Sequence, residues 1–245
     1  MGIGAIVRKL ANECKERLFA VAAHAPVCDR IECHVYCKRI TQAVQSEAKP
    51  ILAASIANLE KLVTEAPKAI DYQSHISIVL ELQAKCLDQS NEPILAKVAL
   101  EKAVKHQREA VRLSKNGRSY RELLGAHLIE LAKLNLKLSE YKEAAANALD
   151  VPNAVPAANR AQGCLDAARS LARLISHASL DRKLAADERE QLTRNYLGRA
   201  VVLLREVIDT NAKLAGEIKK DPDIKALESR PEFQTIMNSL VDLGS

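Results

Sequence analysis

Two stretches of this chain, IDYQSHISIVLELQAK at residues 70–85 and RSYRELLGAHLIELAK at residues 118–133, align without a gap at a shift of 48 positions. Four of the sixteen aligned positions are identical, among them Tyr72 with Tyr120 and Leu80 with Leu128. Each stretch follows a helix-like segment and a short polar break. A repeated helix pair that cannot bury its own apolar face is the physical basis of a solenoid. The shift therefore predicts helical hairpins stacked in series.

The composition agrees with an all-helical chain. Of 245 residues, 38 are Ala and 32 are Leu, both strong helix formers, whereas Gly and Pro number eight each. There is no Trp, and there are two Phe and five Tyr. A β-sandwich or barrel needs aromatic and β-branched strands with frequent turns, and a disordered chain needs fewer apolar residues. We therefore expect an all-α protein with an aliphatic, Ala-lined core.

Apolar residues recur at steps of three and four along most of the chain, which is the helical period. Pro50 is expected at the first position of a helix, Gly117 to cap the C-terminus of one and Ser139 to cap the N-terminus of another. The longest break is expected at residues 150–156. In all, about 10–11 helices are predicted, near residues 3–21, 31–44, 50–63, 76–87, 93–111, 124–138, 141–149, 164–175 and 187–208, with two short ones after 221.

Three segments resemble tetratricopeptide (TPR) repeats, of the degenerate kind that follows the kinase domain in large bacterial serine/threonine protein kinases. They are NLEKLVTEAPKAIDYQ (58–73), HQREAVRLSKNGRSYRELLGAHLIELAKLNLKLSEYKEAA (106–145) and DEREQLTRNYLGRAVVLLREVI (187–208). The first two resemble the junctions between helices of that family, and the third resembles its last full repeat. The chain itself has no Gly-rich phosphate loop, no His-Arg-Asp and no Asp-Phe-Gly, so no kinase domain is predicted in it.

The segment KKDPDIKALESRPEFQTIM (219–237) is similar to the closing element of such arrays. A solenoid end exposes an apolar face that a terminal element must cover. Pro222 and Pro231 are each expected to start a short helix, and Phe233 is expected to fill the last groove. The positions that match the closing pattern are Asp221, Pro222, Asp223, Leu227, Pro231 and Phe233.

The resemblance implies a right-handed solenoid of antiparallel helical hairpins of the TPR type. We expect an N-terminal helical extension at residues 1–46 with a Cys cluster, followed by a TPR-like repeat domain at 47–245. The capping element of that domain is expected at 219–242.

The Cys cluster is the sharpest local motif. Cys28, Cys33, His34 and Cys37 lie close together in the sequence, and Cys33 and Cys37 share one helix face. Such a set is a candidate for a metal site, and Cys-x₄-Cys-His is a wide-spaced relative of a haem-attachment motif. However, structural zinc sites usually pair two Cys-x₂-Cys knuckles, and only one loose half is present. Ordinary helix thiols are the favoured interpretation, and no cofactor is expected.

No other motif predicts chemistry. His-Glu-x-x-His, Glu-x-x-His, Gly-x-Ser-x-Gly and the P-loop do not occur in the sequence, so no catalytic residue is assigned and the chain is expected not to be an enzyme. Tyr120 and His127 are the candidates for facing a partner-binding groove. A half-exposed helix position is the simpler interpretation of both residues.

The charge of +5 comes from 36 basic and 31 acidic residues spread along the chain, which argues against nucleic-acid binding. No stretch approaches the roughly 18 apolar residues of a membrane span, and charges such as Arg8, Glu13 and Arg17 interrupt any signal-like core. We therefore expect a cytoplasmic chain with no membrane partner.

These features lead to three hypotheses for function. The first is a non-catalytic scaffold that binds a protein or peptide in a concave, Ala-lined groove. The second is an accessory or regulatory region of a bacterial serine/threonine kinase signalling system, and the third is a metal- or haem-binding protein that uses the Cys cluster.

Overall fold

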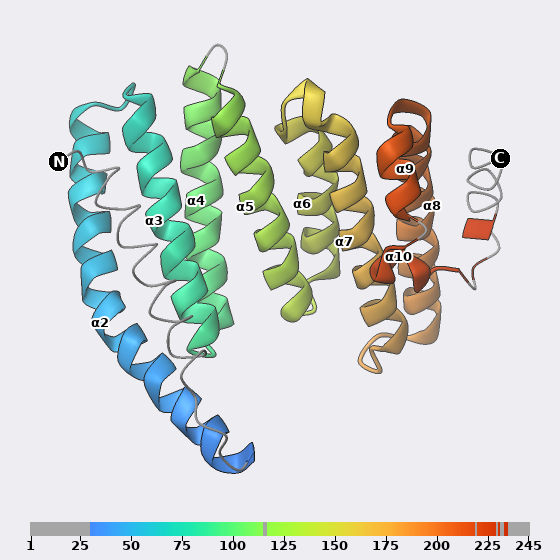
Figure 1. The fold of residues 1–245 in the computed structure, drawn as a ribbon, viewed down its shortest axis with the longest axis horizontal. Coiled ribbons are helices and arrows are strands. Elements are labelled where there is room, and N and C mark those ends of the chain that lie inside the picture. The colour runs from blue at the N-terminus through green and yellow to red at the C-terminus, as the bar shows by residue number, and fades with distance from the viewer. Residues whose placement is uncertain (1–29, 115–116, 219, 229, 231–232, 235–245) are drawn as a thin grey trace. The chain divides into compact units, whose positions relative to one another are not determined.

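The computed structural model describes residues 30–114, 117–218, 220–228, 230 and 233–234, and their side chains from residue 48 onward. The chain divides into two compact units, Met1–His106 and Gln107–Ser245. The described residues form nine α-helices, one short 3₁₀ helix and no strand, so the prediction of an all-α fold is confirmed for this part of the chain. Figure 1 shows the helices and their order along the chain. No helix in the described ranges is long and apolar enough to cross a bilayer.

The first unit contains α2 (Arg30–Glu65), α3 (Ile70–Gln89) and most of α4 (Pro93–Leu113). Helix α2 packs against α3. On α3, Ile76, Val79 and Leu80 are buried, and they are the apolar residues that recur at steps of three and four. The Gln73 side chain on α3 lies 2.8 Å from Nδ1 of His106 on α4, which joins these two helices.

Helix α2 runs without a break through Pro50, so the prediction that Pro50 starts a new helix is wrong. The predicted boundary after residue 46 also lies inside α2. A proline inside a helix removes one backbone hydrogen bond, a local cost that favours a break. Burial of Ile56 and Leu59 beyond the proline stabilises the continued helix. This contribution is not visible in local sequence.

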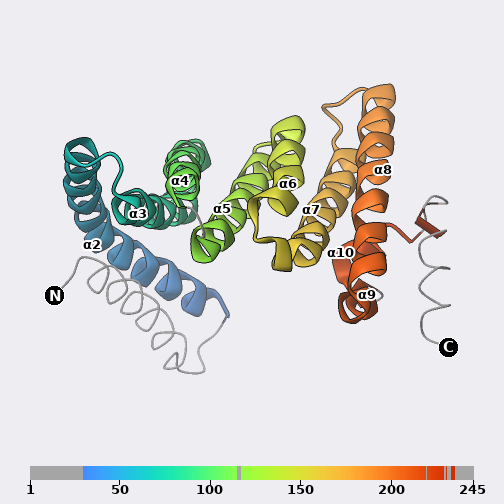
Figure 2. The same cartoon turned by 90° about the horizontal axis from the view of Figure 1, so that it is seen from above.

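The second unit contains α5 (Arg118–Lys137), α6 (Tyr141–Ala154), η1 (Ala157–Asn159), α7 (Arg160–Leu180), α8 (Ala186–Thr210), α9 (Ala212–Ile218) and α10 (Pro222–Lys225). Successive helices from α5 to α9 pack on one another, and α7 also contacts α5, α9 and α10. Figure 2 shows α6 and α8 on the same side of this unit, with α7 between them and set back.

Helix boundaries repeat at the shift of 48 found in the sequence. Helix α3 covers residues 70–89 and α5 covers 118–137, while α4 begins at residue 93 and α6 at 141. Both α3 and α5 end at a residue with positive φ, Asn91 at 62° and Ser139 at 61°. At each end, the amide of this residue and the amide of the next residue donate back to the last turn. In the first case Asn91 N donates to Asp88 O and Glu92 N donates to Leu87 O. These are Schellman motifs, so the repeat extends to turn geometry.

This geometry corrects two expected caps. Ser139 does not cap the N-terminus of α6, because it occupies the left-handed position that closes α5, and the N-cap residue of α6 is Glu140. Gly117 does not close α4, which ends at Leu113, and instead precedes α5. A Cβ at Gly117 would lie 2.5 Å from the Tyr120 ring, so close packing explains a glycine there.

The break expected at residues 150–156 is shorter than predicted. Helix α6 continues to Ala154 with Pro152 inside it. The turn that follows packs tightly between α5 and α7. A Cβ added at Gly125 would lie 2.6 Å from Val155 Cγ1, and one added at Gly163 would lie 2.9 Å from Val155 Cγ2.

The core of the second unit is aliphatic, as the composition predicts. It is built mainly from Ala and Leu of α7 and α8, with Tyr141 and Tyr196 at its edge. Phe233 is fully buried in the same cluster. Pro222 begins α10, as expected, and Asp221 caps it by accepting bonds from the amides of Asp223 and Ile224. Pro231, the other expected helix start, lies outside the described residues.

Candidate functional site

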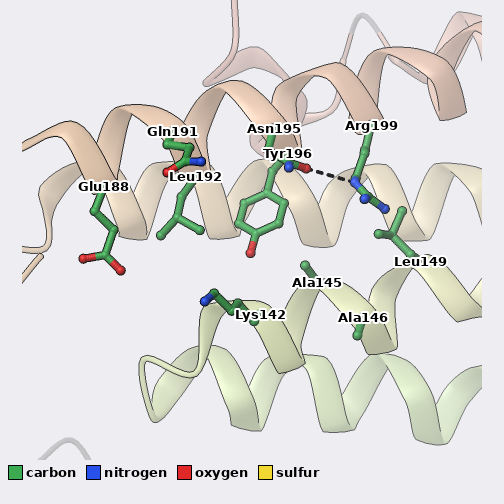
Figure 3. Close-up of a pocket in the computed structure, with 10 residues that line it drawn as sticks. All are labelled: Lys142, Ala145, Ala146, Leu149, Glu188, Gln191, Leu192, Asn195, Tyr196 and Arg199. Atoms are coloured by element: carbon green, nitrogen blue, oxygen red, sulfur yellow. Dashed lines mark hydrogen bonds between the residues drawn. The ribbon is translucent and has the colours of Figure 1, made fainter.

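A groove of about 400 Å³ opens between α6 and α8 in the second unit. Ala145 and Ala146 lie on the α6 side, and their short side chains do not reach across to α8, as Figure 3 shows. The sequence explains the short side chains on this side of the groove, because α6 begins with the Ala-rich stretch YKEAAANAL. The full lining is Lys142, Ala145, Ala146, Leu149, Glu188, Gln191, Leu192, Asn195, Tyr196 and Arg199.

Helical spacing places these residues in two facing rows. On α6 the row has steps of three and four from Lys142 to Leu149, and on α8 it has the same steps from Glu188 to Arg199. Apolar Leu149 and Leu192 therefore alternate with polar side chains along the same opening. The surface is amphipathic rather than a closed apolar pocket.

Tyr196 is held in place at the base of the groove. It is buried, and its hydroxyl donates to the backbone carbonyl of Tyr141 at 3.3 Å. Burial raises the pKa of the Tyr196 phenol, with nearby Arg199 opposing the shift. The ring therefore remains a neutral, rigid surface at physiological pH. Such a fixed aromatic loses little conformational entropy when a ligand packs on it.

Charged groups stand at the two ends of the groove. Glu188 and Lys142 lie toward one end, and Arg199 lies toward the other, beside Leu149 (Figure 3). Arg199 Nε donates to Asn195 Oδ1 at 2.9 Å, which leaves its other guanidinium donors available. Among the described residues, neither Lys142 nor Glu188 has a side-chain partner. By contrast, Arg160 pairs with Glu206 at 2.6 Å and Arg173 with Asp223 at 2.6 Å.

The predicted partner-binding residues lie elsewhere, on α5. His127 is fully buried, so its side chain does not face an open surface. Tyr120 is half-buried, and its carbonyl accepts a hydrogen bond from Gln107 Nε2 at 2.8 Å. Neither residue lines the groove between α6 and α8.

The metal candidates lie outside the side chains that the structure describes. Cys28 lies outside the described residues, and Cys33, His34 and Cys37 belong to the part of α2 whose side chains are not described. Within the described ranges, no group of three or more His, Cys, Asp or Glu side chains could hold a metal ion. The metal and haem hypothesis stays a prediction.

The groove residues were not among the predicted site residues, although the sequence holds a signal for them. Gln191, Asn195 and Arg199 recur every four residues on one face of α8, and this polar row borders the buried stripe of the helix. What the sequence lacks is the information that α6 faces this row across an opening.

No family model matches the chain. The chain is similar to the ATP phosphoribosyltransferase regulatory subunit of Aquifex aeolicus (strain VF5), with 32% identity over 71 residues. The match covers 29% of this chain and spans only 18% of that relative's length.

Proposed function

We propose that this chain is a non-catalytic protein-interaction module, a right-handed solenoid of TPR-like helical hairpins. The 48-residue repeat of helix starts and Schellman turns supports this architecture, because a recurring hairpin is its building unit. The packing of successive helices from α5 to α9 on one another supports it as well.

The groove between α6 and α8 is the proposed binding surface, and it is the observation on which the proposal rests. Its Ala-lined α6 side, its fixed Tyr196 ring and its end charges, which have no ion-pair partner among the described residues, suit an extended peptide or an amphipathic helix of a partner protein. Apolar side chains of the ligand would pack on Leu149 and Leu192. An acidic side chain would pair with Arg199, and a basic one with Glu188.

The proposal is tested by filling the groove. Ala146 is exposed and lines the opening, so Ala146→Arg places a long side chain in it without disturbing the core. Proteins recovered with the wild-type chain by affinity purification, and confirmed to bind it directly, should bind the A146R variant at least about tenfold more weakly. Arg205→Ala is the matched control, because Arg205 is exposed on α8 but does not line the groove. Equal binding by A146R and the wild type would exclude this groove as the site.

The kinase-associated role remains a second proposal. The resemblance of the closing element at residues 219–237 to that of kinase-associated arrays supports it. In that role the chain would alter the rate of an enzyme that it binds, and A146R would lose that effect while R205A kept it. The enzyme to use is one encoded in the same reading frame or beside it in the genome.

A further inference from the structure

A second cavity, of about 330 Å³, lies in the second unit between the end of α7, the first half of α8 and the closing segment. It does not share any lining residue with the groove between α6 and α8. Its polar lining consists of three guanidinium groups, two hydroxyls and one carboxylate. They belong to Arg189, Arg194 and Arg230, to Ser179 and Thr193, and to Glu190.

The cavity carries an excess of positive charge, since three arginines face one glutamate. Glu190 already pairs with Arg194 along α8. Arg189 is fixed by its Nη1, which donates to the carbonyls of Asp181 and Leu184 at 3.2 Å each, so its remaining donors stay available. In the part of the chain that the structure describes, the Arg230 side chain has no hydrogen-bond or ion-pair partner.

Thr193 adds a hydrogen-bond donor to the lining of this cavity. It is 5% exposed, yet its hydroxyl has no hydrogen-bond partner among the described residues. Threonines within helices commonly bond to the carbonyl four residues back, as Thr64 and Thr210 do here, at 2.8 Å and 2.5 Å. Because Thr193 lines the cavity, its hydroxyl can donate a hydrogen bond to an acceptor that binds there.

We propose that this cavity binds the phosphate group of a small phosphomonoester. A phosphomonoester carries close to two negative charges at neutral pH, which matches the net charge of the lining, and its oxygens accept bonds from guanidinium and hydroxyl donors. A monocarboxylate would leave one positive charge uncompensated. The volume is near the lower end of the range for small-molecule sites, which favours a compact ligand.

The site also links the ligand to the closing segment. Arg230 lies between Leu227 and Phe233, both buried in the core, while the other two arginines lie on α8. A bound phosphate would therefore tie the closing segment to α8. This role does not depend on the groove between α6 and α8, so either proposal can fail alone.

Calorimetric titration of the full chain with glycerol 3-phosphate in phosphate-free buffer tests the proposal. We expect saturable binding of one molecule per chain, and none with acetate. Arg230→Gln should weaken binding about 10- to 100-fold, the effect of losing one charge-assisted hydrogen bond. Thr193→Val should weaken it as well. Arg205→Gln removes the same charge from an exposed position on α8 and should leave binding unchanged.

The circular dichroism melting curve of each variant separates loss of binding from loss of fold. R230Q should melt like the wild type because the Arg230 side chain has no hydrogen-bond or ion-pair partner to lose among the described residues. Binding should also weaken as the pH falls through the second phosphate pKa of about 6. The proposal is overturned if glycerol 3-phosphate does not bind saturably, or if R230Q binds it as the wild type does. It is equally overturned if R205Q weakens binding as much as R230Q, since that result indicates only nonspecific charge attraction.

Discussion

Asp221 performs two tasks at one position. One carboxylate oxygen caps α10 through the amides of Asp223 and Ile224, at 3.0 Å and 3.2 Å. The other oxygen accepts from Arg169 Nε on α7 at 2.5 Å. The Asp-Pro-Asp start of the closing segment therefore joins a local capping function to a contact between distant parts of the sequence.

Replacing Asp221 should separate these two tasks. We expect Asp221→Ala to lower the free energy of unfolding by about 2–3 kcal/mol, because it removes the cap and leaves Arg169 with only Asp166. Asp221→Asn keeps an oxygen for the cap and should cost less. Urea unfolding measures both, with Asp209→Asn, at an exposed position on α8, as the control. Equal losses for D221A and D209N would contradict the assignment.

Cys164 makes stability depend on alkaline pH. Burial, together with nearby Glu206, raises the pKa of this thiol to about 11, and burial also raises the pKa of Tyr141. The folded chain therefore keeps these protons at pH values where the unfolded chain releases them. The contribution of the protonated Cys164 thiol to the free energy of unfolding is fully present below the ordinary thiol pKa of 9.0. It is lost as the pH rises from there toward 11.

We expect the urea midpoint of the wild type to fall between pH 8 and pH 10, and that of Cys164→Ala to fall less. Cys86 is only partly buried, so Cys86→Ala should keep the wild-type fall. If C164A and the wild type lose stability equally over this range, the buried thiol does not carry the effect.

At the scale of single elements, the paired turns at Asn91 and Ser139 give the clearest prediction. Left-handed backbone at a residue with a side chain costs about 1 kcal/mol or more, and glycine avoids this cost. Ser139→Gly should therefore raise the free energy of unfolding by about 1 kcal/mol. Asn91→Gly should raise it less, since asparagine tolerates this conformation. Thermal unfolding measures both, and an equal gain from Ser139→Ala would show that backbone strain is not the cause.

Helix positions were largely predictable from apolar periodicity, and their ends were less so. Helix α8 was expected at 187–208 and covers 186–210, because its stripe of buried residues is regular. The error at Pro50 arose because packing against α3 outweighs the local preference of proline. At Ser139 the same residue type suits either a cap or a left-handed turn, and only the bonds of the following amide distinguish them.

The candidate site was less predictable than the fold. Periodicity identifies which face of a helix is buried, but not which helices leave a gap between them. His127 lies on the buried face of α5, which the apolar period of that helix could have indicated. The groove could not be predicted in this way, since α6 and α8 are separated by all of α7 in the sequence.

At the scale of the whole chain, the proposed series of hairpins predicts local responses to mutation. Phe233 is fully buried against the core of the second unit, so Phe233→Ala should cost about 3–5 kcal/mol. If each hairpin is stabilised by its neighbours, hydrogen exchange in F233A should rise first in α8 and α9 and leave the amides of α3 in the first unit protected. A uniform rise across both units would contradict the hairpin-series proposal.

The 48-residue repeat has a consequence for how the sequence of such a chain evolves. Helix starts and turn geometry recur although only four of sixteen aligned residues agree. Duplication of an ancestral helix pair, followed by divergence of its surface residues but not of its turns, would produce this result. Residues at the turns between helices are then constrained by backbone geometry, while exposed residues can change and bind different ligands. Related chains would then share the arrangement of helices and differ in ligand specificity.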